Sequence, residues 1–69
     1  MIARLEFDPG SNRWEIGDRE LHCGDCFHIY DGNGEHPMPV RIEHASDGWY
    51  LITPYGLCRV SNRLAEVGR

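Results

Sequence analysis

Hydrophobic and polar residues alternate along most of this chain, a period of two that is typical of half-buried β-strands and not of helices. Each alternating stretch is short, and turns rich in glycine, proline, asparagine and aspartate separate one stretch from the next. The predicted strands are residues 3–7, 13–16, 26–30, 40–44, 49–52 and 57–60. In the third of them, Phe27 and Ile29 share one face, and Cys26, His28 and Tyr30 share the other.

The segments between these strands carry turn and breaker signals. The predicted connections are turns at residues 8–12, 31–34 and 45–48, a loop at residues 19–25 and a single 3₁₀ turn at residues 53–56. Pro37 and Pro39 lie so close together that a central strand is excluded there. Only the tail, residues 61–69, has helical spacing, with Leu64 and Val67 on one side, so a short C-terminal helical turn is expected.

Five or six short antiparallel strands in 69 residues predict one mostly-β domain, residues 1–69. Such strands suggest a closed or half-closed barrel, because closure removes exposed strand edges, which matter greatly in so small a protein. The order of hairpin, loop, second hairpin and last short strand therefore favours a small SH3-like barrel. This analogy concerns the fold and says nothing about function.

Size and charge narrow the classes of function. A chain this short buries little of its surface and has no room for a deep catalytic cleft, so we expect a binding protein and not an enzyme. The net charge of −4 argues against general duplex nucleic-acid binding, which needs a basic surface. No apolar run approaches the roughly 20 residues of a membrane helix, and the charged start does not resemble a signal peptide, so a cytoplasmic location is expected.

The basic residues and the cysteines are unusual in kind and in number. All seven basic residues are arginines, which suit bidentate recognition of carboxylate or phosphate; a GC-rich genome is the plainer explanation. The three cysteines are an odd number, which fits a reducing compartment better than a secreted disulfide scaffold.

The most promising binding patch lies on the strand pair 40–44 and 49–52. Arg41 and Glu43 point outward there, and depending on the strand register they share a face with Tyr50 or with Trp49. Arginine and aromatic side chains are the commonest hot spots of protein interfaces. The alternatives are a solvated face with a cross-strand ion pair and, for the tryptophan, an anchor of the core.

A second candidate site is the cysteine-rich segment 22–28. Cys23 and Cys26 are spaced as zinc ligands, and His22, His28 or Cys58 would complete the set. The second cysteine pair of a zinc ribbon is missing, so the favoured interpretation is that both cysteines are small buried residues, with no metal and no cofactor.

A third hypothesis is a small phosphorylated ligand such as a cyclic nucleotide, held by Arg41 and Arg59 against an aromatic face. Taken together, the candidate binding residues are Arg41, Glu43, Trp49, Tyr50, Arg59 and His22. A homodimer could complete the core or the site of so small a domain.

Three short boxes, in this order, resemble the domain of unknown function 5348 family: Leu21-His22-Cys23-Gly24, Arg41-Ile42-Glu43 and Trp49-Tyr50-Leu51. The resemblance implies a setting in bacteria, mobile elements and phages, and it implies no activity. By analogy with small acidic phage proteins, the expected function is non-enzymatic binding of a host factor, as by an anti-defence inhibitor such as an anti-CRISPR protein. The negative charge would suit a basic surface on that partner.

Overall fold

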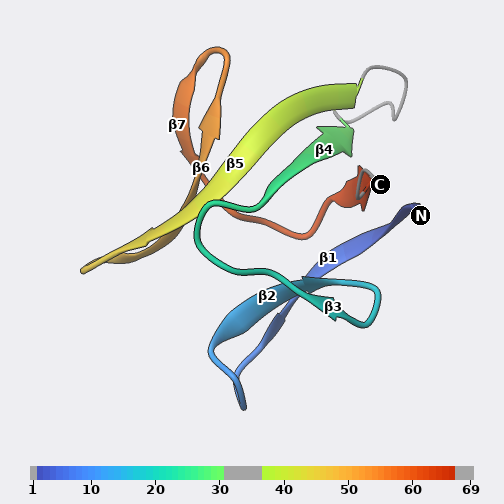
Figure 1. Ribbon diagram of the computed structural model, residues 1–69, viewed down its shortest axis with the longest axis vertical. Helices are drawn as coiled ribbons and strands as arrows, with labels where there is room; N and C mark the ends of the chain where they lie inside the picture. The colour runs from blue at the N-terminus through green and yellow to red at the C-terminus, as the bar shows by residue number, and fades with distance from the viewer. Residues whose placement is uncertain (1, 31–36, 67–69) are drawn as a thin grey trace.

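The computed structural model describes residues 2–30 and 37–66, which form eight antiparallel strands and no helix. The strands are β1 (Ile2–Asp8), β2 (Arg13–Ile16), β3 (Arg19–Glu20), β4 (Cys26–Tyr30), β5 (Pro37–Ala45), β6 (Gly48–Thr53), β7 (Gly56–Arg59) and β8 (Leu64–Glu66). They make a single sheet in the order β3-β2-β1-β8-β4-β5-β6-β7. Figure 1 shows β1–β3 as one group and β4–β7 as another, and the short β8 joins them by pairing with both β1 and β4.

One side of this strongly bent sheet forms the core. Nine apolar side chains are buried, and eight of them alternate along the strands. The nine are Leu5, Ile16, Leu21, Phe27, Ile29, Val40, Ile42, Leu51 and Ala65. Here this side is called the inner face and the opposite side the outer face. The predicted split of the third strand is confirmed, because Phe27 and Ile29 are buried while Cys26 and His28 are exposed.

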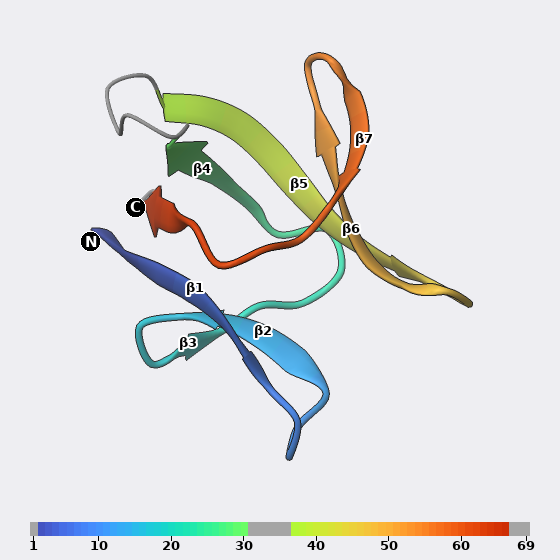
Figure 2. The same cartoon turned by 180° about the vertical axis from the view of Figure 1, so that it is seen from behind.

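The prediction of a mostly-β antiparallel domain is confirmed. The predicted number of strands, five or six, is lower than the eight that the structure contains. The sheet is also open, since no pairing within the described residues joins its two end strands, β3 and β7. The views from front and back agree that the two groups lie side by side without forming a closed barrel (Figures 1 and 2). Both of the strands that were missed, β3 and β8, are too short to show an alternating pattern.

The predicted helical turn at the C-terminus is wrong over its described part. Residues Leu64–Glu66 form β8, and Ala65 is completely buried between Ala3 of β1 and Ile29 of β4. Pairing on both sides outweighs the weak helical spacing, because helices of nine residues or fewer are marginal on their own. Val67 lies outside the described residues.

Two of the predicted connections differ from the structure. Part of the predicted loop 19–25 forms β3, which pairs with β2. The predicted 3₁₀ turn is instead the two-residue loop of the β6–β7 hairpin, since Thr53 pairs with Gly56. The Thr53 hydroxyl holds this loop by accepting from the Tyr55 amide at 3.0 Å and donating to the Gly56 carbonyl at 2.8 Å. The predicted turn 31–34 lies outside the described residues.

Pro37 and Pro39, which were predicted to exclude a central strand, do lie in a strand. They occupy the part of it that has a neighbouring strand on one side only. In β5, the stretch from Pro37 to Val40 pairs with β4, whereas pairing with β6 begins only at Arg41. Ile42 exchanges backbone hydrogen bonds with the chain just before β4, so the even positions of β5 turn their backbone groups toward β4 and the odd positions turn theirs away. The missing N–H groups of Pro37 and Pro39 therefore fall on the open side of the strand.

Candidate functional site

The predicted binding patch is assembled on the outer face by β5, β6 and β7. Glu43 lies opposite Tyr50, and Tyr50 lies opposite Arg59, so these three residues form one cross-strand row. The register thus resolves the open choice of aromatic partner in favour of Tyr50. Four of the six candidate residues meet here, because Arg41 follows in the neighbouring row.

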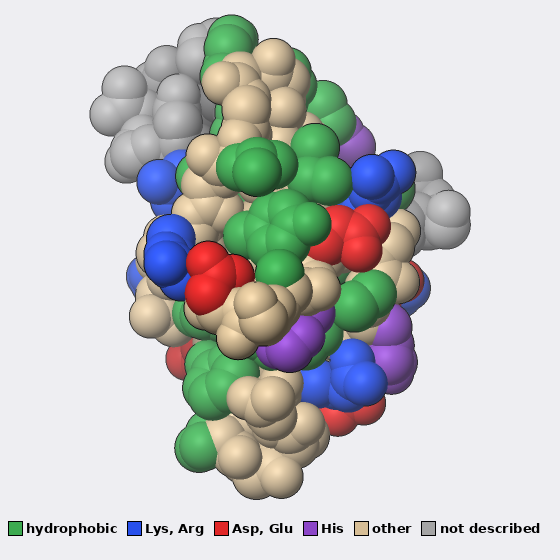
Figure 3. Space-filling view, turned by 90° about the vertical axis from the view of Figure 1, so that its left-hand side faces the viewer, with side chains coloured by type: hydrophobic (Ala, Val, Ile, Leu, Met, Phe, Trp, Pro, Cys, Tyr) green, Lys and Arg blue, Asp and Glu red, His purple; other side chains and the backbone are tan. Residues whose placement is uncertain are grey.

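That neighbouring row runs Cys26–Arg41–Ile52–Leu57 across four strands. Ile52 is half-buried and the Leu57 side chain is 70 % exposed. Sequence patterns did not select either residue, because both were assigned to strands without a decision on which face they occupied. Their apolar side chains make the outer face partly hydrophobic, and hydrophobic side chains gather where β6 and β7 lie (Figure 3).

Charged groups border these apolar side chains. Arg41 Nε lies 3.0 Å from Glu43 Oε2, and the two side chains are 52 % and 27 % exposed. Such an exposed pair contributes only about 0.2–1 kcal/mol to stability, so its main effect is to hold Arg41 flat along β5. Arg59 Nη1 donates to the Asp47 carbonyl at 3.4 Å, a long and weak hydrogen bond.

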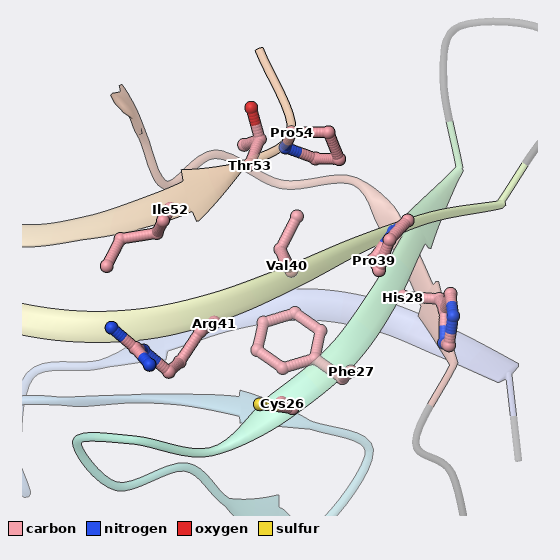
Figure 4. A pocket seen from close by; sticks show the side chains of 9 residues that line it. All are labelled: Cys26, Phe27, His28, Pro39, Val40, Arg41, Ile52, Thr53 and Pro54. Carbon is pink, nitrogen blue, oxygen red and sulfur yellow. The ribbon is translucent and has the colours of Figure 1, made fainter. Parts of the chain in front are cut away.

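A groove opens where β5 and β6 part, and its lining includes Phe27 and Val40 of the inner face as well as Arg41 of the outer face. Its volume is about 380 Å³, and Figure 4 shows Thr53 and Pro54 on the far side of β5 from Cys26 and His28 of β4. The register of β5 and β6, extended past its last pair of Arg41 and Ile52, would bring Pro39 opposite Pro54. Neither residue has an N–H, so the hydrogen-bonded ladder cannot continue past Arg41 and Ile52.

Trp49, another of the candidate residues, lies on the inner face and not with Arg41 and Glu43. Its ring packs against that of His44 with centroids 4.6 Å apart, and the Arg13 guanidinium lies 5.8 Å from the ring centroid on the β1–β2 side. The indole Nε1 donates to the Asn12 carbonyl at 2.9 Å. Trp49 thus packs against the core, as the alternative interpretation expected, and it also contacts the β1–β2 hairpin.

His22 lies apart from the face as well, in a tight turn that ends at Asp25. The Asp25 amide donates to the His22 carbonyl at 3.0 Å, and the Asp25 carboxylate accepts from the His22 amide at 2.8 Å. Gly24 occupies the third position of this turn with φ of +91°, as a type II turn requires. The Leu21-His22-Cys23-Gly24 box is thus a structural element, with Leu21 in the core and Gly24 in the turn.

The interpretation of Cys23 and Cys26 as buried residues is wrong, because both are exposed. Cys23 sits at the tip of the turn, and Cys26 Sγ lies 3.7 Å from the Gly24 carbonyl oxygen. Cys58 is half-buried and belongs to the inner-face row of Leu51. Within residues 2–30 and 37–66, no group of three or more His, Cys, Asp and Glu side chains is placed to hold a metal ion.

A row of carboxylates, not singled out in the sequence, crosses the outer face of β1–β3. Glu6 lies opposite Glu15, and Glu15 lies opposite Glu20. Partial burial, together with the charges of Asp8 and Glu20, raises the pKa of Glu15. Like charges directly opposite one another destabilise a sheet, so this row makes the N-terminal hairpin strongly acidic at a cost to the fold.

The fold and the face together define a class of protein: a small, open, antiparallel β domain with a mixed aromatic and arginine surface on its outer side. The chain belongs to the family described as a domain of unknown function (DUF5348), which matches residues 3–65. The predicted family is thereby confirmed, with a match over nearly the whole chain, while the three boxes themselves stay a prediction. Searches of curated proteins and of solved structures found no significant match. The described part of the chain contains no helix that is long and apolar enough to span a membrane.

Proposed function

We propose that this chain is a non-enzymatic binding module that docks on a partner protein through the outer face of β5–β7. The observation that carries the proposal is the pair of adjacent cross-strand rows, Glu43–Tyr50–Arg59 and Arg41–Ile52–Leu57. They place one aromatic and two aliphatic side chains between two arginines. Tyrosine and arginine are enriched among the few residues that dominate the binding energy of protein interfaces.

The core supports this proposal because it is complete without the face. All nine buried apolar residues lie on the inner side of the sheet or in the loop before β4, and none belongs to the two rows. Ile52 and Leu57 therefore present apolar surface that folding leaves in water. On a domain this small, such a patch is typical of an interaction site.

The chemistry of the partner is indicated by charge. The net charge is −4, and the Glu6–Glu15–Glu20 row concentrates negative charge on the N-terminal hairpin. A partner with a basic surface would be attracted toward this hairpin. The bacterial and phage setting implied by the family makes a host nucleic-acid-binding protein, as targeted by anti-defence inhibitors, the partner we expect.

A phosphorylated small ligand is less well supported by the same geometry. Glu43 lies 3.0 Å from Arg41, so a phosphate at Arg41 would have to displace or repel a carboxylate. Thermal-shift measurements with mono-, di- and cyclic nucleotides provide the comparison. A protein-binding face predicts no shift in melting temperature with any of them.

The main test is affinity capture from a bacterial lysate, quantified by mass spectrometry for the wild type and for three face variants, Arg41→Ala, Tyr50→Ala and Arg59→Ala. Arg4→Ala is the matched control, since Arg4 is an exposed strand arginine on β1, outside the face. We expect one set of captured proteins to fall about tenfold with each face variant, the 1.4 kcal/mol of a moderate hot spot. Capture that is equal for all four variants and the wild type would overturn the proposal.

A further inference from the structure

Within the described residues, both end strands of the sheet, β3 and β7, have an open edge, as does the first part of β5, and two of these three edges are protected. β3 is only two residues long and both of them are charged, Arg19 and Glu20. The open side of β5 carries Pro37 and Pro39, which have no N–H to offer. Short charged edge strands and edge prolines are the devices by which proteins prevent sheets from joining edge to edge.

β7 is the third open edge and lacks these devices. Within the described residues it pairs with β6 alone, and it contains neither proline nor acidic residue in its four positions. Its Leu57 is 70 % exposed, and Tyr55, in the adjoining turn, is 90 % exposed. These are the two most exposed large hydrophobic side chains of the described protein.

The β6–β7 hairpin fixes which backbone groups this edge presents. Thr53 and Gly56 flank a two-residue loop and form a hydrogen-bonded pair, so Cys58 also turns its backbone groups inward to β6. The N–H and C=O groups of Leu57 and Arg59 then point outward. The edge offers two donors and two acceptors in the spacing that another antiparallel strand would complete.

We propose that β7 pairs with β7 of a second copy, so that the chain forms a two-fold symmetric dimer through a continuous sheet. In the register that we propose, Leu57 lies opposite Leu57 of the second copy across the two-fold axis, which brings the two exposed leucine side chains together. Each Leu57 amide then donates to the Leu57 carbonyl of the other copy. On the outer face, Ile52 and Leu57 of one copy continue directly into Leu57 and Ile52 of the other.

Charge and shape are complementary in this register. It brings Arg59 of one copy to the turn that carries Tyr55 of the other, and no two arginines face each other. Arg59 also borders a hollow of about 440 Å³, shared with Tyr50 and Asp47, at the side of β7. An aromatic ring entering beside a guanidinium gains a cation–π contact, so the exposed Tyr55 has a site to occupy on the second copy.

This dimer forms through main-chain pairing at an edge and not through docking of the face, but Leu57 and Arg59 belong to both, so Arg41 is the residue that distinguishes the two proposals. Four-residue strands bury less than a standard interface, so we expect a weak dimer that dissociates on dilution. Sedimentation velocity over protein concentrations from about 1 µM to about 1 mM brackets affinities of this strength. Hydrogen exchange of the Leu57 and Arg59 amides should slow as the dimer fraction rises.

Two variants test the pairing in different ways. Leu57→Lys puts two like charges at the axis, and Leu57→Pro removes the outward N–H without removing a bond to β6. Each should raise the dimer dissociation constant at least about tenfold, the 1.4 kcal/mol of one lost pairing interaction. Ile2→Lys is the matched control because Ile2 is 55 % exposed on β1, and its dimer should resemble that of the wild type.

A chain that stays monomeric across the whole concentration range overturns the proposal. So does a dimer that both Leu57 variants leave unchanged, because its interface would then lie elsewhere. If the Leu57 variants abolish the dimer while Arg41→Ala leaves it intact, the edge is the dimer interface, whatever the capture experiment shows for the face.

Discussion

The indole Nε1 of Trp49 donates a 2.9 Å hydrogen bond to the carbonyl oxygen of Asn12, 37 residues away in the chain. Trp49 begins the β6 side of the second hairpin, and Asn12 ends the first turn with φ of +60°. Within the described residues, strand pairing joins the two strand groups of the sheet only through the short β8. The Trp49–Asn12 contact is a second connection between them, at the opposite end of the molecule from β8.

Replacing Trp49 by phenylalanine should weaken this second connection. The variant keeps an aromatic ring near His44 but loses the hydrogen bond to Asn12, which is worth about 1 kcal/mol. For a domain of this size that loss lowers the melting temperature by roughly 4–8 °C. Tyr55→Phe is the control, because it also removes a polar group from an aromatic ring, and Tyr55 is 90 % exposed. It should leave the melting temperature unchanged. Equal melting of both variants would contradict the role assigned to Trp49.

Gly24 should be the most sensitive position of the turn before β4. A Cβ at Gly24 would meet no atom within 4 Å, so the cost of Gly24→Ala comes only from the backbone at φ of +91°. That cost is about 1–2 kcal/mol, measurable by urea unfolding. Cys23→Ala, one position earlier and exposed, should be nearly neutral. Destabilisation by Cys23→Ala together with bound zinc in the wild type would instead support the metal hypothesis.

Alternation predicted the strands well wherever a strand has one buried and one exposed face. Ile42 and Leu51 were placed correctly on the inner face for that reason, and the six predicted strands overlap six of the eight that the structure contains. β8 was missed because Leu64 to Glu66 is too short to show a period and is held by tertiary pairing on both sides. No local pattern encodes that pairing.

The candidate site was predicted in part, for a similar physical reason. Arg41 and Glu43 were assigned to the outward face from alternation alone, but the partner aromatic depended on a one-residue register that only the Ala45–Gly48 pairing fixes. The two-residue loop between Ala45 and Gly48 was the sequence signal that could have fixed this register. No sequence signal predicted the exposure of Leu57. Its position at the edge of the sheet follows from the order of the strands and not from the residue itself.

The carboxylate row predicts an unusual dependence of stability on pH. The pKa of Glu15 is raised in the folded chain above its ordinary 4.5, so the folded state binds this proton more tightly than the unfolded state does. Glu15 therefore opposes folding at neutral pH, and its effect disappears as the pH falls through the raised pKa toward 4.5. Glu15→Gln should melt higher than the wild type at pH 7, and the two should converge in acid.

Glu43→Gln is the matched control for this experiment, since the Glu43 carboxylate lies 3.0 Å from Arg41 and not opposite other carboxylates. It should melt at or below the wild-type temperature at pH 7. If Glu15→Gln were also neutral or destabilising at pH 7, repulsion along the Glu6–Glu15–Glu20 row would be absent.

Tyr30 should titrate abnormally because it connects β4 to β8. Its hydroxyl donates to Glu66 Oε1 at 2.6 Å, and this hydrogen bond to a carboxylate raises the pKa of Tyr30 above its ordinary 10.0. A tyrosine that stays neutral longer in the folded state stabilises the fold below pH 10, and that contribution is lost as the pH rises through the raised pKa. Tyrosinate absorbance should therefore show a late step that Tyr30→Phe removes.

Glu66→Gln separates the charge from the hydrogen bond in the same titration. The amide oxygen still accepts from the Tyr30 hydroxyl, but the negative charge that disfavours tyrosinate is gone. The late step should then move only part of the way down toward pH 10, because the hydrogen bond, the largest cause of the raised pKa, is kept. β8 should stay paired, as reported by unchanged protection of the Ala65 amide. A late step that falls fully to pH 10 in Glu66→Gln would mean that the charge of Glu66, and not the hydrogen bond, sets the pKa of Tyr30.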